Sequence, residues 1–61
     1  MKTGDQVQTF ASVMATTADT GKRAELTPQV FTMVDADNDP CTVMDEFDQE
    51  WKLPLTAVFP T

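Results

Sequence analysis

The residues of this 61-residue sequence that are best able to bind ions or partners are carboxylates gathered in one segment. Seven of the ten acidic residues fall between positions 35 and 50, a segment that contains no Lys or Arg. They are Asp35, Asp37, Asp39, Asp45, Glu46, Asp48 and Glu50. Carboxylate oxygens bind hard cations such as Ca²⁺, and a group of them without neutralising bases attracts positively charged partners. The segment therefore has two candidate chemistries, cation binding and recognition of a basic surface.

The first part of this segment has the acidic spacing of a calcium loop. Carboxylates occupy the first, third, fifth and twelfth positions of residues 35–46, as Asp35, Asp37, Asp39 and Glu46. This run resembles an EF-hand loop, in which those positions and a backbone carbonyl, here that of Cys41, supply oxygens to Ca²⁺. The sixth position is Pro40, where such a loop needs Gly to turn sharply. We interpret the run as an acidic hairpin turn without a metal, and we keep a calcium-binding module as an alternative.

The composition argues against catalysis. The chain has no His, which removes His-based acid–base catalysis, nucleophile–His pairs and His-ligated zinc. Its single cysteine, Cys41, cannot form an intrachain disulfide, and acidic neighbours make a thiol less reactive. We therefore predict a protein that is not an enzyme and that has no catalytic residues and no cofactor.

The charge pattern favours one class of partner. The chain carries four Lys and Arg against ten Asp and Glu, a formal net charge of −6 at pH 7. Outside residues 35–50 there are three acids and four bases, so the rest of the chain carries +1. An acidic segment repels nucleic-acid phosphates and anionic lipid but attracts a basic protein surface. We predict that its seven acids bind the partner together with Trp51, because Trp is enriched at interaction hot spots.

Alternation of apolar and polar residues predicts short β-strands. The segments with this alternation are residues 5–13, 26–34, 41–47 and 51–55, followed by a short last strand at 56–60. In the third segment the alternation places Phe47 on the same side as Cys41 and Val43. Polar or turn-forming residues separate the strands, as at residues 15–23 and 35–40. The pattern predicts an all-β fold of four or five strands.

Two short motifs resemble those of SH3-like small β-barrels. At the C-terminal end, Leu53 and Pro54 precede a potential one-turn helix, and Val58 follows in a position to pack under a barrel. Near the start, Gly4-Asp5-Gln6-Val7 is similar to the first strand of many such domains. The resemblance implies a five-stranded SH3-like barrel with a short 3₁₀ turn before the last strand. SH3 domains grip polyproline with Tyr and Trp, and since this chain has no Tyr, that activity is not carried over.

These observations predict a single domain, residues 1–61, that acts by binding. We favour a protein-interaction module, a small inhibitor or an assembly subunit that binds a basic protein surface through its acidic hairpin. The alternatives are the calcium-binding module and a nucleic-acid mimic. Because so short a chain has a small core, a homo-oligomer also stays open. The sequence contains no apolar run of about 18 residues and no signal h-region, so we expect no membrane contact and a cytoplasmic location.

Overall fold

Seven short strands and one turn of 3₁₀ helix make up the fold in the computed structural model, which describes residues 1–61. The strands are β1 (Gln6–Gln8), β2 (Val13–Thr17), β3 (Arg23–Leu26), β4 (Val30–Asp35), β5 (Cys41–Met44), β6 (Glu50–Leu53) and β7 (Phe59–Pro60). The 3₁₀ turn, η1 (Leu55–Ala57), lies between β6 and β7. The fold is therefore all-β, as the alternation in the sequence predicts.

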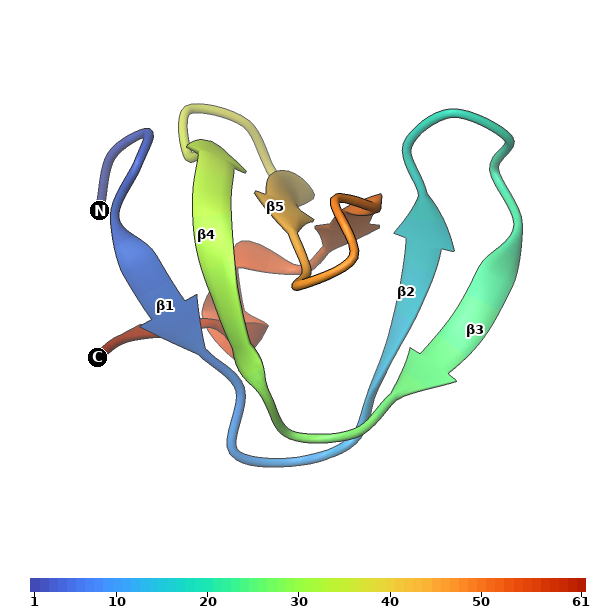
Figure 1. Cartoon of the computed structure of the whole chain (residues 1–61), viewed down its shortest axis with the longest axis horizontal. Helices are drawn as coiled ribbons and strands as arrows, with labels where there is room; N and C mark the ends of the chain where they lie inside the picture. The colour runs from blue at the N-terminus through green and yellow to red at the C-terminus, as the bar shows by residue number, and fades with distance from the viewer.

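All the strands join one open antiparallel sheet in the order β3-β2-β6-β5-β4-β1-β7. The consecutive strands β4, β5 and β6 form the middle of this sheet. The pairings that join the other strands to this middle link segments far apart in the sequence, since β1 pairs with β4 and β7, and β2 pairs with β6. In Figure 1 the β2–β3 hairpin lies to the right, whereas β1 and β4 lie to the left, near both termini.

The inward side of the sheet surrounds one small core. Eight apolar residues are buried there: Val7, Ala15, Phe31, Met33, Cys41, Val43, Leu53 and Val58. Phe31 and Met33 are two positions apart on β4, and Cys41 and Val43 are two apart on β5, so each pair points to one side of its strand. Only 10 of the 61 residues are buried, and each core side chain therefore contributes a large share of the burial.

The predicted strand at residues 5–13 is wrong, because the chain bends within it. Strand β1 ends at Gln8, and β2 begins only at Val13. Phe10 is 66% exposed, and Ala11, which the alternation places inward, is exposed as well. The bend lets the two halves of the segment pair with different strands, β1 with β4 and β2 with β6.

The loop predicted at residues 15–23 is likewise shorter than expected. Strand β2 continues to Thr17, and β3 begins at Arg23, so the two form a hairpin. The Thr17 hydroxyl accepts a hydrogen bond of 3.0 Å from the Lys22 amide, which helps to close the hairpin turn. The next predicted strand, residues 26–34, is also divided, because Pro28 lies in the connection between β3 and β4.

Because the predicted strands are divided, the sheet has seven strands where the sequence predicts four or five. The sheet is also open, so a closed five-stranded barrel is not confirmed. The 3₁₀ turn expected before the last strand is present as η1. Its backbone closes through a hydrogen bond of 2.9 Å from the Ala57 amide to the Pro54 carbonyl. Leu53 before it and Val58 after it are both buried in the core.

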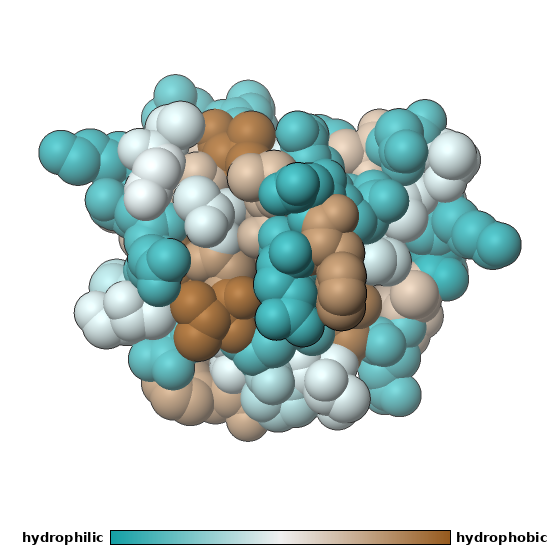
Figure 2. Space-filling model, in the orientation of Figure 1, coloured by the Kyte–Doolittle hydropathy of each residue, from teal (hydrophilic) through white to brown (hydrophobic).

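The surface carries several large apolar side chains between polar ones. Figure 2 shows this pattern on one face, where separate brown patches lie among teal residues. The exposed large apolar residues are Met1, Phe10, Met14, Val30, Phe47 and Phe59. No helix is long and apolar enough to cross a membrane.

Candidate functional site

Strand β5 divides the acidic segment into two groups. Asp35, at the end of β4, and the next residues to position 40 form the acidic loop, which leads into β5 at Cys41. Residues 45–50, here called the acidic turn, leave β5 at its other end and begin β6. The four residues of β5 span about 10 Å at the usual rise of a strand. The seven predicted acids therefore lie in two groups, at opposite ends of β5.

Two of the three carboxylates of the acidic loop, those of Asp35 and Asp39, accept hydrogen bonds that hold the loop in place. Asp35 accepts hydrogen bonds from the Asn38 side chain at 2.9 Å and from the Asp37 amide at 3.0 Å. These bonds, that of Asn38 foremost, lower the pKa of Asp35 below its ordinary value. Asp39 accepts a hydrogen bond of 3.0 Å from the Leu55 amide, which ties the loop to η1. These acids stabilise the connection between β4 and β5.

The arrangement does not support the calcium loop that the spacing of residues 35–46 resembles. Residues 41–44, which would have to wrap around the cation, are extended in β5. Glu46 consequently lies beyond the far end of that strand from Asp35. No group of three or more Asp, Glu, Cys or His side chains lies close enough together to hold a metal ion.

The acidic turn is organised around Asp45. Its Oδ1 accepts hydrogen bonds from the backbone amides of Phe47 at 2.8 Å and Gln49 at 3.0 Å. The Asp45 amide donates to the Gln49 carbonyl at 3.0 Å, and the Asp48 amide donates to the Asp45 carbonyl at 3.2 Å. Asp48 has a φ of 64°, in the left-handed region that Asp adopts more readily than most residues. Four hydrogen bonds thus fix the backbone of the five-residue connection between β5 and β6.

Trp51 supports the turn from below. Its indole Nε1 donates a hydrogen bond of 2.9 Å to Asp45 Oδ2, and its ring is half-buried against the core. Desolvation raises the pKa of Asp45, but the hydrogen bonds from Trp51, Gln49 and Phe47 together outweigh it, so the pKa lies below its ordinary value. Asp45 is therefore ionised at neutral pH and binds its neighbours as a carboxylate. Trp51 therefore stabilises the turn from the side of the core. Its direct contact with a partner stays a prediction.

Phe47 projects from this fixed turn into solvent. It is 80% exposed, the largest exposed fraction among the large apolar side chains. The sequence predicts an inward position for it by continuing the alternation of β5, and this prediction is wrong because β5 ends at Met44. Glu46 and Asp48, its neighbours in sequence, are exposed too. The turn therefore presents one aromatic ring between carboxylates.

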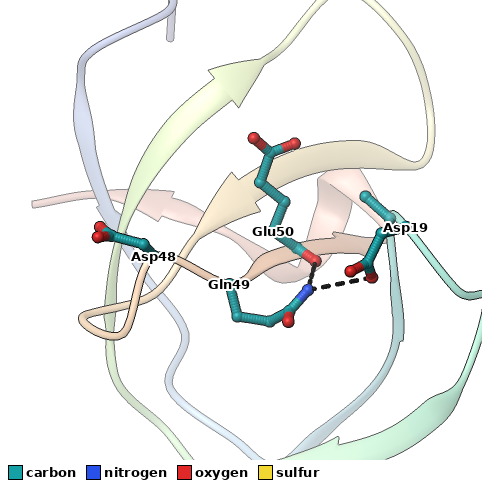
Figure 3. A pocket seen from close by; sticks show the side chains of 5 residues that line it. Asp19, Asp48, Gln49 and Glu50 are labelled. Carbon is teal, nitrogen blue, oxygen red and sulfur yellow. Dashed lines mark hydrogen bonds between the residues drawn. The ribbon is translucent and has the colours of Figure 1, made fainter.

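A shallow, open depression of about 330 Å³ lies beside the turn. Figure 3 shows its lining, which consists of Ala18, Asp19, Asp48, Gln49 and Glu50. The Gln49 side-chain amide donates to the Glu50 carbonyl at 2.9 Å and to Asp19 Oδ1 at 3.4 Å, and so joins the β2–β3 connection to the turn. In Figure 3 the carboxylates of Asp19, Asp48 and Glu50 point in different directions.

The structure therefore assembles part of the predicted site and adds to it. Asp45, Glu46, Asp48 and Glu50 come together with Trp51 at the acidic turn. Asp35, Asp37 and Asp39 lie apart in the acidic loop. Asp19 and Phe47 are the additions. The pairing of β2 with β6 brings Asp19 to the turn, and no local signal in the sequence indicates that pairing.

Cys41 is buried and has no partner cysteine. Its Sγ donates a hydrogen bond of 3.4 Å to the Leu53 carbonyl, and burial, more than any other effect, raises the pKa of its thiol. A buried thiol of raised pKa is a poor nucleophile. Its position fits a small core residue.

Comparisons with known proteins assign the chain to no family. No protein-family model matches it, and neither the curated proteins nor the solved structures give a significant match.

Proposed function

We propose that this chain is a non-enzymatic interaction module that binds a basic protein surface through the acidic turn. The observation that carries the proposal is the presentation of Phe47, 80% exposed, on a backbone fixed by hydrogen bonds to Asp45. An exposed aromatic ring between carboxylates combines the two features of a polar-rimmed hot spot. Asp19 extends the acidic rim across the depression.

The charge of the site supports a basic partner. Four of the six residues 45–50 are acidic, and the whole chain carries −6. A local negative potential of this kind accelerates the encounter with a positive surface and discourages acidic partners. Because Glu46, Asp48 and Glu50 are exposed, each ion pair that they form contributes only about 0.2–1 kcal/mol and weakens with salt. Charge therefore selects and steers the partner, while other contacts must supply much of the affinity.

Phe47 is suited to supply the affinity that the charges do not. Burying a Phe side chain contributes about 1.5–3 kcal/mol relative to leaving it in water. The turn is already ordered by Asp45, so little conformational entropy is lost when the partner binds. We infer a partner surface with an apolar pocket surrounded by Lys or Arg. Such a module suits an adaptor, an assembly subunit or a small inhibitor.

We further infer an SH3-like fold as the scaffold of this site. The one-turn helix after Pro54, with Leu53 and Val58 buried on either side of it, supports the resemblance. The pairing of the first strand with both β4 and the last strand is a second supporting feature. Binding through the acidic turn does not require the fold to be SH3-like.

A matched pair of variants tests the proposal. Glu46→Gln with Asp48→Asn removes two charges from the acidic turn, and Asp37→Asn with Glu25→Gln removes two charges elsewhere, so both variants have the same net charge. The probe is a short peptide containing Lys, Arg and Leu, and the readout is its dissociation constant. We expect the turn variant to bind about three- to tenfold more weakly and the control variant to bind nearly as the wild type does. Equal weakening in both would show that only net charge matters and would overturn the proposal.

A further inference from the structure

A second surface of the molecule combines exposed apolar side chains with uncharged polar ones. Residues 6–18, 26–34 and 53–61 contain no Asp, Glu, Lys or Arg. These segments provide all of β1 and β7 and all of β4 except its last residue, Asp35. The sheet order places β4, β1 and β7 side by side. Strands β4, β1 and β7 therefore carry no charged side chain except that of Asp35, although Asp5 directly precedes β1 and the chain as a whole carries −6.

Three large apolar side chains lie on the outward side of these strands. Gln8 of β1 pairs with Val30 of β4 and with Phe59 of β7, so the three side chains point to one side of the sheet. Val7 and Phe31, which neighbour Gln8 and Val30 in their strands, are buried in the core. Because side chains alternate along a strand, Gln8, Val30 and Phe59 point outward. Val30 is 51% exposed, and Phe59 is 45% exposed.

Phe10 extends this row. It is 66% exposed, and its ring centroid lies 5.3 Å from that of Phe59, at an interplanar angle of 48°. The two rings form a tilted pair of the kind that aromatic side chains favour. Phe10, Val30 and Phe59, with the amide of Gln8 between the strands, are here called the neutral face.

We propose that the neutral face is a contact between two copies of this chain. Two molecules of charge −6 repel each other wherever their acids meet, whereas the neutral face brings no charged side chain of its strands against its copy. A two-fold contact places the same patch on both partners, and an uncharged apolar patch is complementary to itself. A basic partner gains no electrostatic attraction from the neutral face. The neutral face and the acidic turn therefore favour different partners.

The dimensions of the chain permit such a contact. A standard interface covers about 800 Å² of each partner, which is about one fifth of the 3902 Å² surface of this molecule. The rings of Phe10 and Phe59 would form its apolar centre, and Gln6, Gln8 and Thr32 on the same side of β1 and β4 would supply polar groups around it. With three apolar side chains at the centre, we expect a dimer that forms reversibly as concentration rises.

The test is sedimentation equilibrium of the full chain over a range of concentrations, at low and at high salt. The wild type should form dimers, and salt should increase the dimer fraction by screening the repulsion between acidic copies. Salt should weaken the binding of a basic peptide to the acidic turn, so the two contacts respond in opposite directions. This contrast separates a failure of the dimer from a failure of the proposed function.

Three variants make the test specific. Phe10→Ser and Val30→Lys should each raise the dimer dissociation constant roughly tenfold or more, while Phe47→Ser should leave it unchanged. Val30→Lys changes the net charge from −6 to −5 and so reduces the repulsion between copies, and a charge effect alone would strengthen the dimer. An ¹H–¹⁵N spectrum verifies that each variant is folded. If only one of Phe10→Ser and Val30→Lys folds, that variant alone is enough to test the dimer. A wild type that stays monomeric, or face variants that associate as the wild type does, would overturn the inference.

Discussion

The indole Nε1 of Trp51 donates a hydrogen bond of 2.9 Å to Asp45 Oδ2, and the same carboxylate fixes the backbone of the turn through its other oxygen. The only tryptophan of the chain therefore connects the core to the acidic turn. Through this pair, folding of the sheet orders the segment that presents Phe47.

The first prediction concerns the stability that Asp45 provides. Asp45→Ala should reduce the free energy of unfolding by about 1–3 kcal/mol, because it leaves the Trp51 indole and two turn amides without their acceptor. Glu46→Ala is the control, since this exposed neighbour accepts none of these hydrogen bonds. Urea unfolding measured by Trp51 fluorescence gives both values. An equal, small loss in the two variants would contradict the role assigned to Asp45.

The second prediction concerns pH. The pKa of Asp45 in the folded chain lies below its ordinary value of 3.8, so the unfolded chain binds the proton at a higher pH than the folded chain does. The stability from this group is therefore complete at neutral pH and is lost as the pH falls from about 4 through the folded pKa. Asp45→Asn should flatten this dependence relative to the wild type. Carboxyl NMR titration checks the sign directly, and a folded pKa above the ordinary value would refute it.

The third prediction concerns the core. Leu53→Ala should cost about 2–5 kcal/mol, which is most of the stability that so small a domain has, and the variant should be largely unfolded. Val30→Ala removes an exposed side chain and should cost under about 1 kcal/mol. Circular dichroism and thermal unfolding distinguish the two. A stable Leu53→Ala variant would mean that Leu53 is not in the core.

The fourth prediction concerns calcium. Millimolar Ca²⁺ should leave the ¹H–¹⁵N spectrum of the chain unchanged, because β5 separates Glu46 from the aspartates of the acidic loop. Large shifts confined to residues 35–46 would support the calcium module instead. Mg²⁺ at the same concentration serves as the control for effects of ionic strength.

The sequence predicts those parts of the fold that depend on local patterns. Alternation correctly places Phe31 and Met33 on the same face of a strand, and Pro54 correctly precedes the 3₁₀ turn. The bend after Gln8 carries no Gly or Pro, so nothing local indicates that the predicted first strand divides. Its cause is tertiary, since the two halves pair with different strands.

The candidate site shows the same division between local and non-local information. The acids of residues 45–50 can be recognised by composition alone. The outward position of Phe47 cannot, because it depends on β5 ending at Met44. Asp19 reaches the site only through the pairing of β2 with β6, and it lies 30 residues before Gln49, to which it is hydrogen-bonded.

Binding at the acidic turn is tested directly by an NMR titration of the ¹⁵N-labelled chain with the Lys-, Arg- and Leu-containing peptide. We predict that shift changes concentrate at residues 45–50 and Asp19, that salt reduces them, and that Phe47→Ser weakens binding about tenfold while the spectrum stays that of a folded chain. Shift changes centred on the acidic loop or the neutral face, or binding unaffected by Phe47→Ser, would contradict the account.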